Sequence, residues 1–162
     1  MNIRYAEVLL ILAEALYEKN GSISDTDLNR TINALRDRVG LIHLTNDLVN
    51  SNDLEMLTEI RRERTVELAY EGFRYTDLRR WKLAEVFLPV SLKGVKYVGS
   101  EFETTAPNDD LVIGVDIEVD ADGFIIADDI SGRTFSDKLY LSAIPLDQIK
   151  LNPNLLPNNP GW

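Results

Sequence analysis

The chain has 162 residues, a length that allows one domain with its own buried core. Its 27 acidic residues outnumber 17 Lys and Arg, and the formal net charge of −10 argues against a binder of nucleic acid or of an anionic membrane. There is no Cys and only one His, His43, which excludes disulfides, a thiol nucleophile, cysteine-based zinc sites and multi-histidine metal sites from this chain.

The first forty residues predict a helical hairpin. Residues 3–19 carry apolar residues at helical spacing on more than one side, and Gly21 is a suitable stop. A second helix is predicted from Ser24 or Asp25 to Val39, ended by Gly40. The helical pattern begins at Ile3, almost at the first residue, so we expect this chain to be part of a longer protein in which Met1 is an internal position. A single hairpin needs neighbours to bury its apolar faces, as helical repeats do.

Two more helices are predicted after a polar linker at residues 44–53. The third covers about 54–71 and ends at Gly72, and the fourth covers about 75–85. We therefore expect residues 1–85 to form a helical scaffold.

The charge and the structural pattern both change after residue 86. Residues 100–137 contain eleven acidic residues and one basic residue, Arg133. The charge of this segment therefore equals the net charge of the whole chain. Short β-prone runs at 95–98, 111–119 and 124–127 are separated by turn-forming residues. Residues 115–119 alternate apolar and acidic side chains, which predicts a half-exposed strand. Residues 86–138 are therefore read as an acidic, β-containing variable insertion.

The last segment, 139–162, begins with a β-prone run at 139–144, followed by a helical turn at about 147–151. The tail from Asn152 contains three prolines and is expected to be extended. The predicted fold class is mainly α, with tetratricopeptide-like helical hairpins, a small β-containing insertion and an extended C-terminal tail.

Four glutamates recur at i,i+4 spacing: Glu59, Glu63, Glu67 and Glu71. Repulsion between like charges at this spacing destabilises a helix unless nearby cations pair with them. Paired carboxylates can serve acid–base catalysis, as in glycoside hydrolases, where the catalytic acid has a raised pKa. Nearby arginines have the opposite effect, because a positive charge lowers the pKa of a carboxyl group. We favour an ion network that fixes helix packing. Its predicted members are Arg62, Glu63, Arg64, Glu67, Glu71, Arg74, Asp77 and Arg80. Further candidate partners are Arg79, Arg36 and Arg38.

The insertion offers two candidate binding features. Sugar rings stack on exposed aromatic faces, and the insertion offers Tyr97, Phe102, Phe124 and Phe135, of which Tyr97 and Phe102 are the candidates for such a platform. The preferred interpretation is that these rings close a small core of the β-containing segment. Residues 118–129 resemble a calcium loop, with oxygen ligands at Glu118, Asp120, Asp122 and Asp129 around Gly123. The first and last ligands depart from the EF-hand pattern and the flanks read as strands. An acidic hairpin turn is therefore preferred, and no cofactor is expected.

Several blocks resemble the C-terminal region of SusD/RagB-type proteins. They are Ile3–Leu10 with Ala13–Ala15, Ile32–Leu41, Ile60–Arg64 through Glu67–Leu68, Glu71–Gly72, Arg74, Asp77–Leu78 and Arg80–Trp81, and the ending Ala143–Pro145 with Asn152–Leu155 and Asn159–Trp162. The resemblance implies a non-catalytic, glycan-binding lipoprotein on the outer surface of Bacteroidota. Such proteins present oligosaccharides to a SusC-like, TonB-dependent outer-membrane transporter. The lipid anchor and the N-terminal part would lie outside this chain, leaving it as the C-terminal scaffold.

Two other functions remain open from the residues alone. A helical-repeat adaptor would bind a protein segment in a groove and have no affinity for polysaccharide. A carbohydrate-active enzyme would use the paired carboxylates and turn over a glycan.

Overall fold

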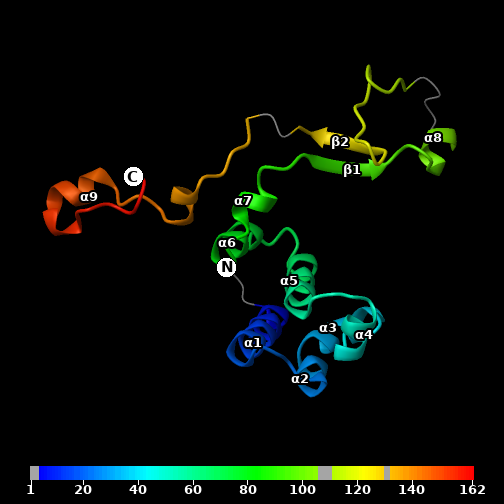
Figure 1. The fold of residues 1–162 in the computed structure, drawn as a ribbon, viewed down its shortest axis with the longest axis horizontal. Coiled ribbons are helices and arrows are strands. Elements are labelled where there is room, and N and C mark those ends of the chain that lie inside the picture. The colour runs from blue at the N-terminus through cyan, green and yellow to red at the C-terminus, as the bar shows by residue number, and fades with distance from the viewer. Residues whose placement is uncertain (1–3, 106–110, 130–131) are drawn as a thin grey trace. The chain divides into compact units, whose positions relative to one another are not determined.

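The computed structural model describes residues 4–105, 111–129 and 132–162 (Figure 1). The chain divides into two compact units, Met1–Tyr75 and Thr76–Trp162. Helices predominate in the described ranges, which also contain one two-stranded sheet. The predicted, mainly helical fold class is therefore confirmed. None of the helices in these ranges has the length and apolar character that crossing a bilayer requires.

The first helix, α1 (Tyr5–Asn20), ends where the sequence predicts. Gly21 adopts a left-handed conformation with φ of 70°, and its N–H donates to the Tyr17 carbonyl at 2.8 Å. A residue with a Cβ is strained in this conformation, so glycine ends the helix at little cost. Helix α1 buries Ala6, Leu9, Leu10 and Ala13 and packs against α2, α3 and α5.

The second predicted helix is broken in two, which corrects the expectation of one continuous helix. The pieces are α2 (Asp25–Arg30) and α3 (Ile32–Val39), with Thr31 at φ −122° and ψ −95° between them. The Thr31 hydroxyl donates to the Asp27 carbonyl at 2.6 Å, a local bond that competes with regular helix geometry. Gly40 ends α3 with φ of 70°.

The predicted linker at 44–53 is also corrected, because it contains a short helix, α4 (Asn46–Ser51). The Thr45 hydroxyl caps it by accepting from the Leu48 N–H at 3.1 Å. The loop before α4 is held by the fully buried Asn33. The Asn33 side chain accepts from the Leu44 N–H at 2.8 Å and donates to the Leu44 carbonyl at 2.9 Å, so one amide satisfies both backbone groups.

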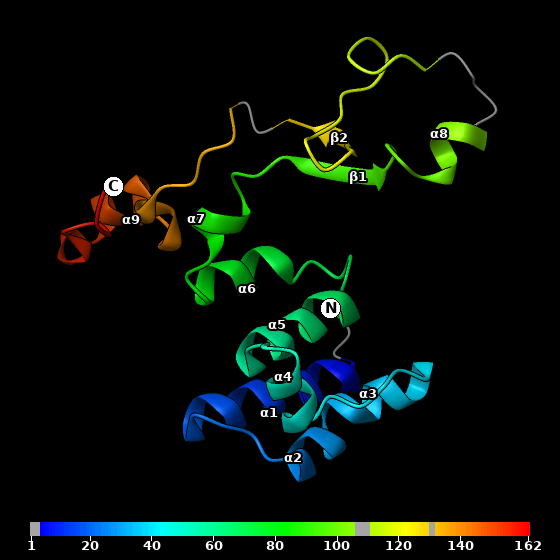
Figure 2. The same ribbon diagram turned by 45° about the vertical axis from the view of Figure 1, so that its right-hand side comes forward.

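Helix α5 (Met56–Glu67) is shorter than predicted and lies beside α1 (Figure 2). The core of this unit joins α1, α2, α3, α4 and α5. Its largest fully buried apolar side chains are Leu10, Leu28, Ile32, Leu44 and Ile60.

The predicted fourth helix is interrupted. Helix α6 (Arg74–Arg80) and helix α7 (Ala84–Phe87) are separated by Lys82, whose φ is 57°. The second unit has its own small core of Leu78, Trp81, Ala84 and Tyr140. The rings of Phe135 and Tyr140 meet edge-on, with centroids 4.9 Å apart.

The insertion contains strands β1 (Leu92–Lys96) and β2 (Phe124–Asp128), paired antiparallel, and a short helix α8 (Glu101–Thr105). The strand predicted at 115–119 forms only in part, because its described residues make isolated bridges, at Ile117 and Val119, and no regular strand. Gly114 has φ of 83°, and the Asp116 carboxylate accepts from the Val112 N–H at 2.9 Å. These local bonds make a turn where the alternating pattern predicts a ladder.

The C-terminal segment forms η1 (Asp137–Tyr140), α9 (Leu146–Leu151) and η2 (Pro153–Leu155), so the β-prone run at 139–144 is not a strand. The tail is tied back to this segment by side chains. Asn158 accepts from the Ile144 N–H and donates to its carbonyl. The Trp162 indole donates to the carbonyls of Lys138 and Leu141. The proline-containing tail is thereby held without a regular ladder.

Candidate functional site

The turn between residues 120 and 124 is organised by one carboxylate. Asp120 Oδ1 accepts from the backbone N–H groups of Asp122 and Phe124, both at 2.9 Å. Gly123 has φ of 85°, and a Cβ there would lie 2.8 Å from the Val98 Cβ. The predicted Asp122-Gly123 turn is therefore present, and it needs glycine for both conformation and space.

Asp120 also pairs with a cation from the neighbouring strand. Its Oδ2 contacts the Lys93 ammonium, which lies 5.4 Å from the centroid of the Phe124 ring. The hydrogen bond from Lys93, followed by that from the Phe124 N–H, holds the pKa of the Asp120 carboxyl below its ordinary value. The same contact with Asp120 raises the pKa of the Lys93 ammonium. The pair ties β1 to the turn before β2.

The four candidate calcium ligands are used differently by the fold. The Asp120 carboxylate binds two backbone N–H groups and the Lys93 ammonium. The Asp122 carboxylate lies 3.6 Å from the Lys93 ammonium at the exposed turn. The Glu118 carbonyl accepts from the Ile126 N–H at 2.8 Å, and the Asp129 carbonyl accepts from Arg133 at 3.0 Å. In the part of the chain that the structure describes, no group of three or more Asp, Glu, His or Cys is arranged to hold a metal ion.

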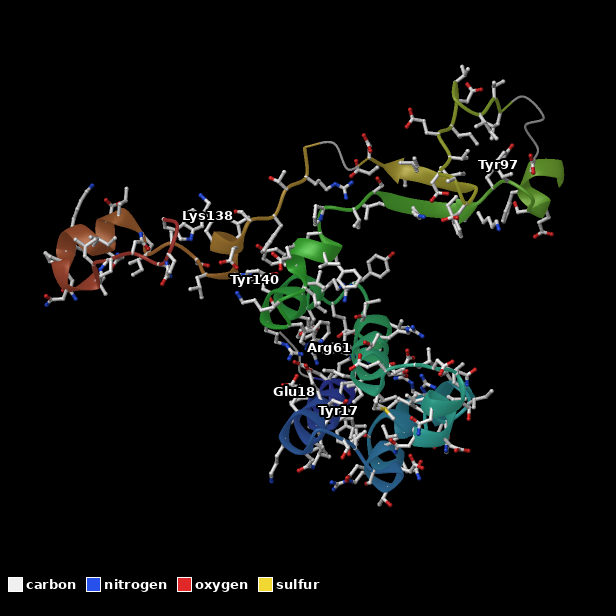
Figure 3. The ribbon with its side chains drawn as sticks, in the orientation of Figure 1. Tyr17, Glu18, Arg61, Tyr97, Lys138 and Tyr140 are labelled. Carbon is white, nitrogen blue, oxygen red and sulfur yellow. The ribbon has the colours of Figure 1, made fainter. Side chains whose placement is uncertain are left out.

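The two candidate stacking rings differ in exposure. Tyr97 is 7% exposed and lies beside the β1–β2 hairpin (Figure 3), so its ring is not open to solvent. Phe102, on α8, is 50% exposed. The hydroxyl of Ser100 accepts from the Phe102 N–H at 3.2 Å, and the Glu103 carboxylate accepts from the Gly99 N–H at 2.7 Å. Phe102 is therefore an exposed ring on a helix whose start is held by local bonds.

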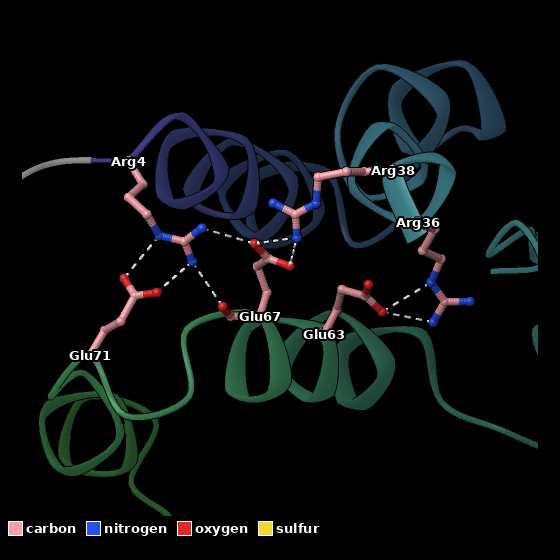
Figure 4. A network of polar contacts seen from close by, with 6 residues as sticks. All are labelled: Arg4, Arg36, Arg38, Glu63, Glu67 and Glu71. Carbon is pink, nitrogen blue, oxygen red and sulfur yellow. Dashed lines mark hydrogen bonds and ion pairs between the residues drawn. The ribbon is translucent and has the colours of Figure 1, made fainter. Parts of the chain in front are cut away.

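The glutamates of α5 and the following turn are paired with arginines from elsewhere in the first unit (Figure 4). Arg36 donates to one oxygen of Glu63 through Nε at 3.0 Å and Nη2 at 2.8 Å. Arg38 contacts both oxygens of Glu67 at 2.8 and 3.0 Å. The side chains of Arg36 and Glu63 are each about 15% exposed. Both carboxylates therefore accept from arginines of α3.

Arg4 is the member of this network that the sequence reasoning missed. Its Nη1 lies 3.2 Å from Glu67 Oε1, and its Nε donates to Glu71 at 3.1 Å. Hydrogen bonding to Glu71, followed by the contacts with Glu67, raises the pKa of the Arg4 guanidinium. The signal in the sequence was the repeat of glutamates at i,i+4 spacing, which requires cations nearby without identifying them. Arg4 is more than sixty residues away, so spacing could not select it.

The other predicted network members lie in separate local contacts. Arg62 pairs with the buried Glu59 at 3.0 Å, and Asp77 pairs with Arg80 at 2.9 Å. The Arg64 guanidinium lies 5.3 Å from the Phe73 ring centroid, and Arg74 donates to the Thr65 hydroxyl at 2.9 Å. Arg61 reaches Glu18 on α1 at 3.5 Å (Figure 3). Arg79, a further candidate, donates to the Tyr140 carbonyl at 2.7 Å.

Comparison with known proteins identifies the relatives of this chain. The model of the SusD family matches residues 1–162. SusD-like protein P2 of Formosa agariphila is 32% identical over 165 residues, which cover 99% of this chain and 25% of that protein.

Two solved structures from Bacteroides fragilis are similar in fold. A SusD-like carbohydrate binding protein has a TM-score of 0.64 and 32% identity, covering 95% of this chain and 28% of its own. A second SusD-like protein has a TM-score of 0.63 and 29% identity, and the match covers 99% of this chain and 25% of that protein's chain. The chain thus spans about a quarter of the length of these relatives.

Proposed function

The chain belongs to the SusD family, and on that premise we propose that it is the C-terminal scaffold part of a non-catalytic glycan-binding protein. The observation that carries the proposal is the family match over the whole chain, together with a similar structure described as a carbohydrate binding protein. We extend the proposal to location and partner. The longer protein would be a surface-exposed lipoprotein of the outer membrane, handing oligosaccharides to a SusC-like, TonB-dependent transporter.

The role of scaffold is supported by how the first unit uses its charged residues. Glu63, Glu67 and Glu71 all accept from arginines that come from other helices or from the start of α1. Such pairs fix the approach of helices, and each of these carboxylates is engaged by a guanidinium. This supports a binding role in which the helices hold a surface in place.

Phe102 is our candidate for a glycan contact in this chain. Its ring is half exposed, whereas Tyr97 is buried and is dropped from the proposal. An exposed aromatic ring can stack on the apolar face of a pyranose, and the neighbouring Glu101 and Glu103 can accept hydrogen bonds from hydroxyls.

An array of plant, host and microbial glycans, probed with this chain and with the longer protein, tests the proposal. Phe102→Ala and Phe102→Leu separate stacking from general apolar contact, because leucine keeps bulk but has no ring. We expect both variants to lose affinity about equally, by roughly tenfold, which is the scale of one good aromatic contact. Full binding by Phe102→Leu would contradict stacking. Unchanged binding by both would remove Phe102 from the site while leaving the family role to be tested on the longer protein.

A further inference from the structure

Among the residues that the structure describes, strand β1 (Leu92–Lys96) is paired along one edge and has no partner on the other. The sheet has two strands (Figures 1 and 2), and two further backbone bonds reach β2: the Glu118 carbonyl accepts from the Ile126 N–H, and the Asp120 N–H donates to the Phe124 carbonyl. Within the described residues, no hydrogen bond links the opposite edge of β1 to another segment. A strand in this position presents unpaired N–H and C=O groups to any extended chain that reaches it.

The composition of β1 makes this edge open to pairing. All five of its residues are exposed, including Leu92 at 53% and Val95 at 54%. Edge strands are commonly protected by lysines that project into solvent. Here both lysines are engaged: Lys93 contacts Asp120, and the ammonium groups of Lys93 and Lys96 lie 5.4 and 6.0 Å from the Phe124 ring centroid. The usual electrostatic protection of an edge is therefore reduced.

A two-stranded ribbon gains from a further strand. Isolated hairpins are marginally stable in water, and a third strand with a shared apolar face adds backbone bonds and burial. The exposed Leu92 and Val95 supply apolar contacts that β2 alone does not cover.

The surrounding charge decides which kind of strand can be added. Residues 92–129 contain two lysines and ten acidic residues. A second copy of this chain would bring two such negative segments together, and that repulsion opposes edge-to-edge pairing. A segment carrying Lys or Arg would be attracted instead, and apolar residues on it could contact Leu92 or Val95, which are three positions apart on a strand of irregular register.

We propose that the free edge of β1 is a docking site for an extended, basic segment of a partner protein, which adds to the sheet as a third strand. Backbone hydrogen bonds give this interaction its strength, and the acidic residues of the insertion select for a cationic partner. The proposal is independent of glycan binding, since it uses the edge of β1 and not the ring of Phe102.

A fluorescent synthetic peptide of alternating Lys and Val, titrated against the chain by anisotropy, tests the proposal. We expect saturable binding that weakens with added salt. Amide exchange in residues 92–96 should slow when the peptide is bound, because their free N–H groups become paired. Two further peptides of equal charge separate strand pairing from charge attraction. One is N-methylated at the odd residues and the other at the even residues, so that only one of them loses the N–H groups that face β1. That peptide should bind at least about tenfold more weakly than the other.

Two chain variants provide a matched control. Val95→Lys places a new cation on the edge, whereas Val115→Lys adds the same charge at another exposed position of the insertion. The first should weaken binding clearly more than the second. Equal binding by all the peptides, or equal effects of the two variants, would mean charge attraction alone and would overturn the proposal, as would the absence of binding. Self-association that competes with the peptide would assign the edge to a second copy.

Discussion

Arg4 and Glu67 are joined through both the side chain and the backbone of the glutamate. Arg4 Nη1 donates to Glu67 Oε1 at 3.2 Å, and Nη2 donates to the Glu67 carbonyl oxygen at 2.9 Å. Glu67 is the last residue of α5, where carbonyls lack helical partners, so the guanidinium also serves as a cap. Arg38 binds the same carboxylate from the last turn of α3. Glu67 thus links the start of α1, the end of α3 and the end of α5.

Glu67→Gln should therefore destabilise the first unit. Two arginines lose their charged acceptor, and the site is only 12% exposed, so we expect a loss of about 1–3 kcal/mol in the free energy of unfolding. Urea unfolding measures it. Glu18→Gln is the control, because Glu18 is half exposed and only loosely paired, and its effect should stay within about 0.5 kcal/mol. Loss of glycan turnover in a stably folded Glu67→Gln protein would instead support the enzyme alternative.

Asn33→Ala should destabilise the same unit by a different mechanism. The substitution leaves the N–H and C=O of Leu44 without the side chain that satisfies them, in a fully buried position. We expect a cost of about 2–4 kcal/mol, since two buried polar groups lose a partner. Asn20→Ala, on the exposed last turn of α1, is the control and should be nearly neutral. Equal stability of the two variants would show that water replaces the Asn33 amide.

The stability of the hairpin should depend on acid pH through Asp120. Its pKa is lower in the folded chain than the ordinary value of 3.8, because Lys93 and the Phe124 N–H bind the charged form. The contribution is therefore complete above about pH 4 and is lost as the pH falls through the lower folded pKa. Thermal unfolding or amide exchange of residues 92–128 across this range measures it. Asp120→Asn should remove this part of the pH dependence, and an unchanged profile would contradict it.

Millimolar calcium should leave the melting temperature unchanged. Asp120 already binds two backbone N–H groups and Lys93, so a metal ion would have to break those contacts before it gained a ligand. Ligand binding to the folded state raises thermal stability, so a melting curve with and without calcium is a direct test. A rise in melting temperature that Asp122→Asn abolishes would restore the calcium loop.

The features that sequence could predict are those set by single residues and local spacing. Gly21 and Gly40 end helices as predicted, each at φ of 70°. The family resemblance, the mainly helical fold and the Asp122-Gly123 turn were also predicted correctly. These features depend on glycine conformation and on motif order, both of which are readable without tertiary structure.

The features that sequence missed depend on contacts between distant segments. The pairing of Arg4 with Glu67 joins residues 63 positions apart, and no spacing rule selects it. Core packing was the preferred interpretation for the rings of the insertion, but the sequence could not say that Tyr97 is buried and Phe102 is half exposed. The strand predicted at 115–119 forms only in part: the Asp116 side chain accepts from the Val112 N–H and turns the chain, whereas the Glu118 carbonyl accepts from β2.

Non-catalytic glycan binding is tested by calorimetric titration of the longer protein and of this chain against soluble glycans, followed by chromatography of the recovered glycan. We expect saturable binding by the longer protein, equal or weaker binding by this chain, and a glycan recovered at its original length. A shortened glycan would show catalysis and contradict the non-catalytic role. Binding of no glycan by either protein would contradict the glycan-binding function.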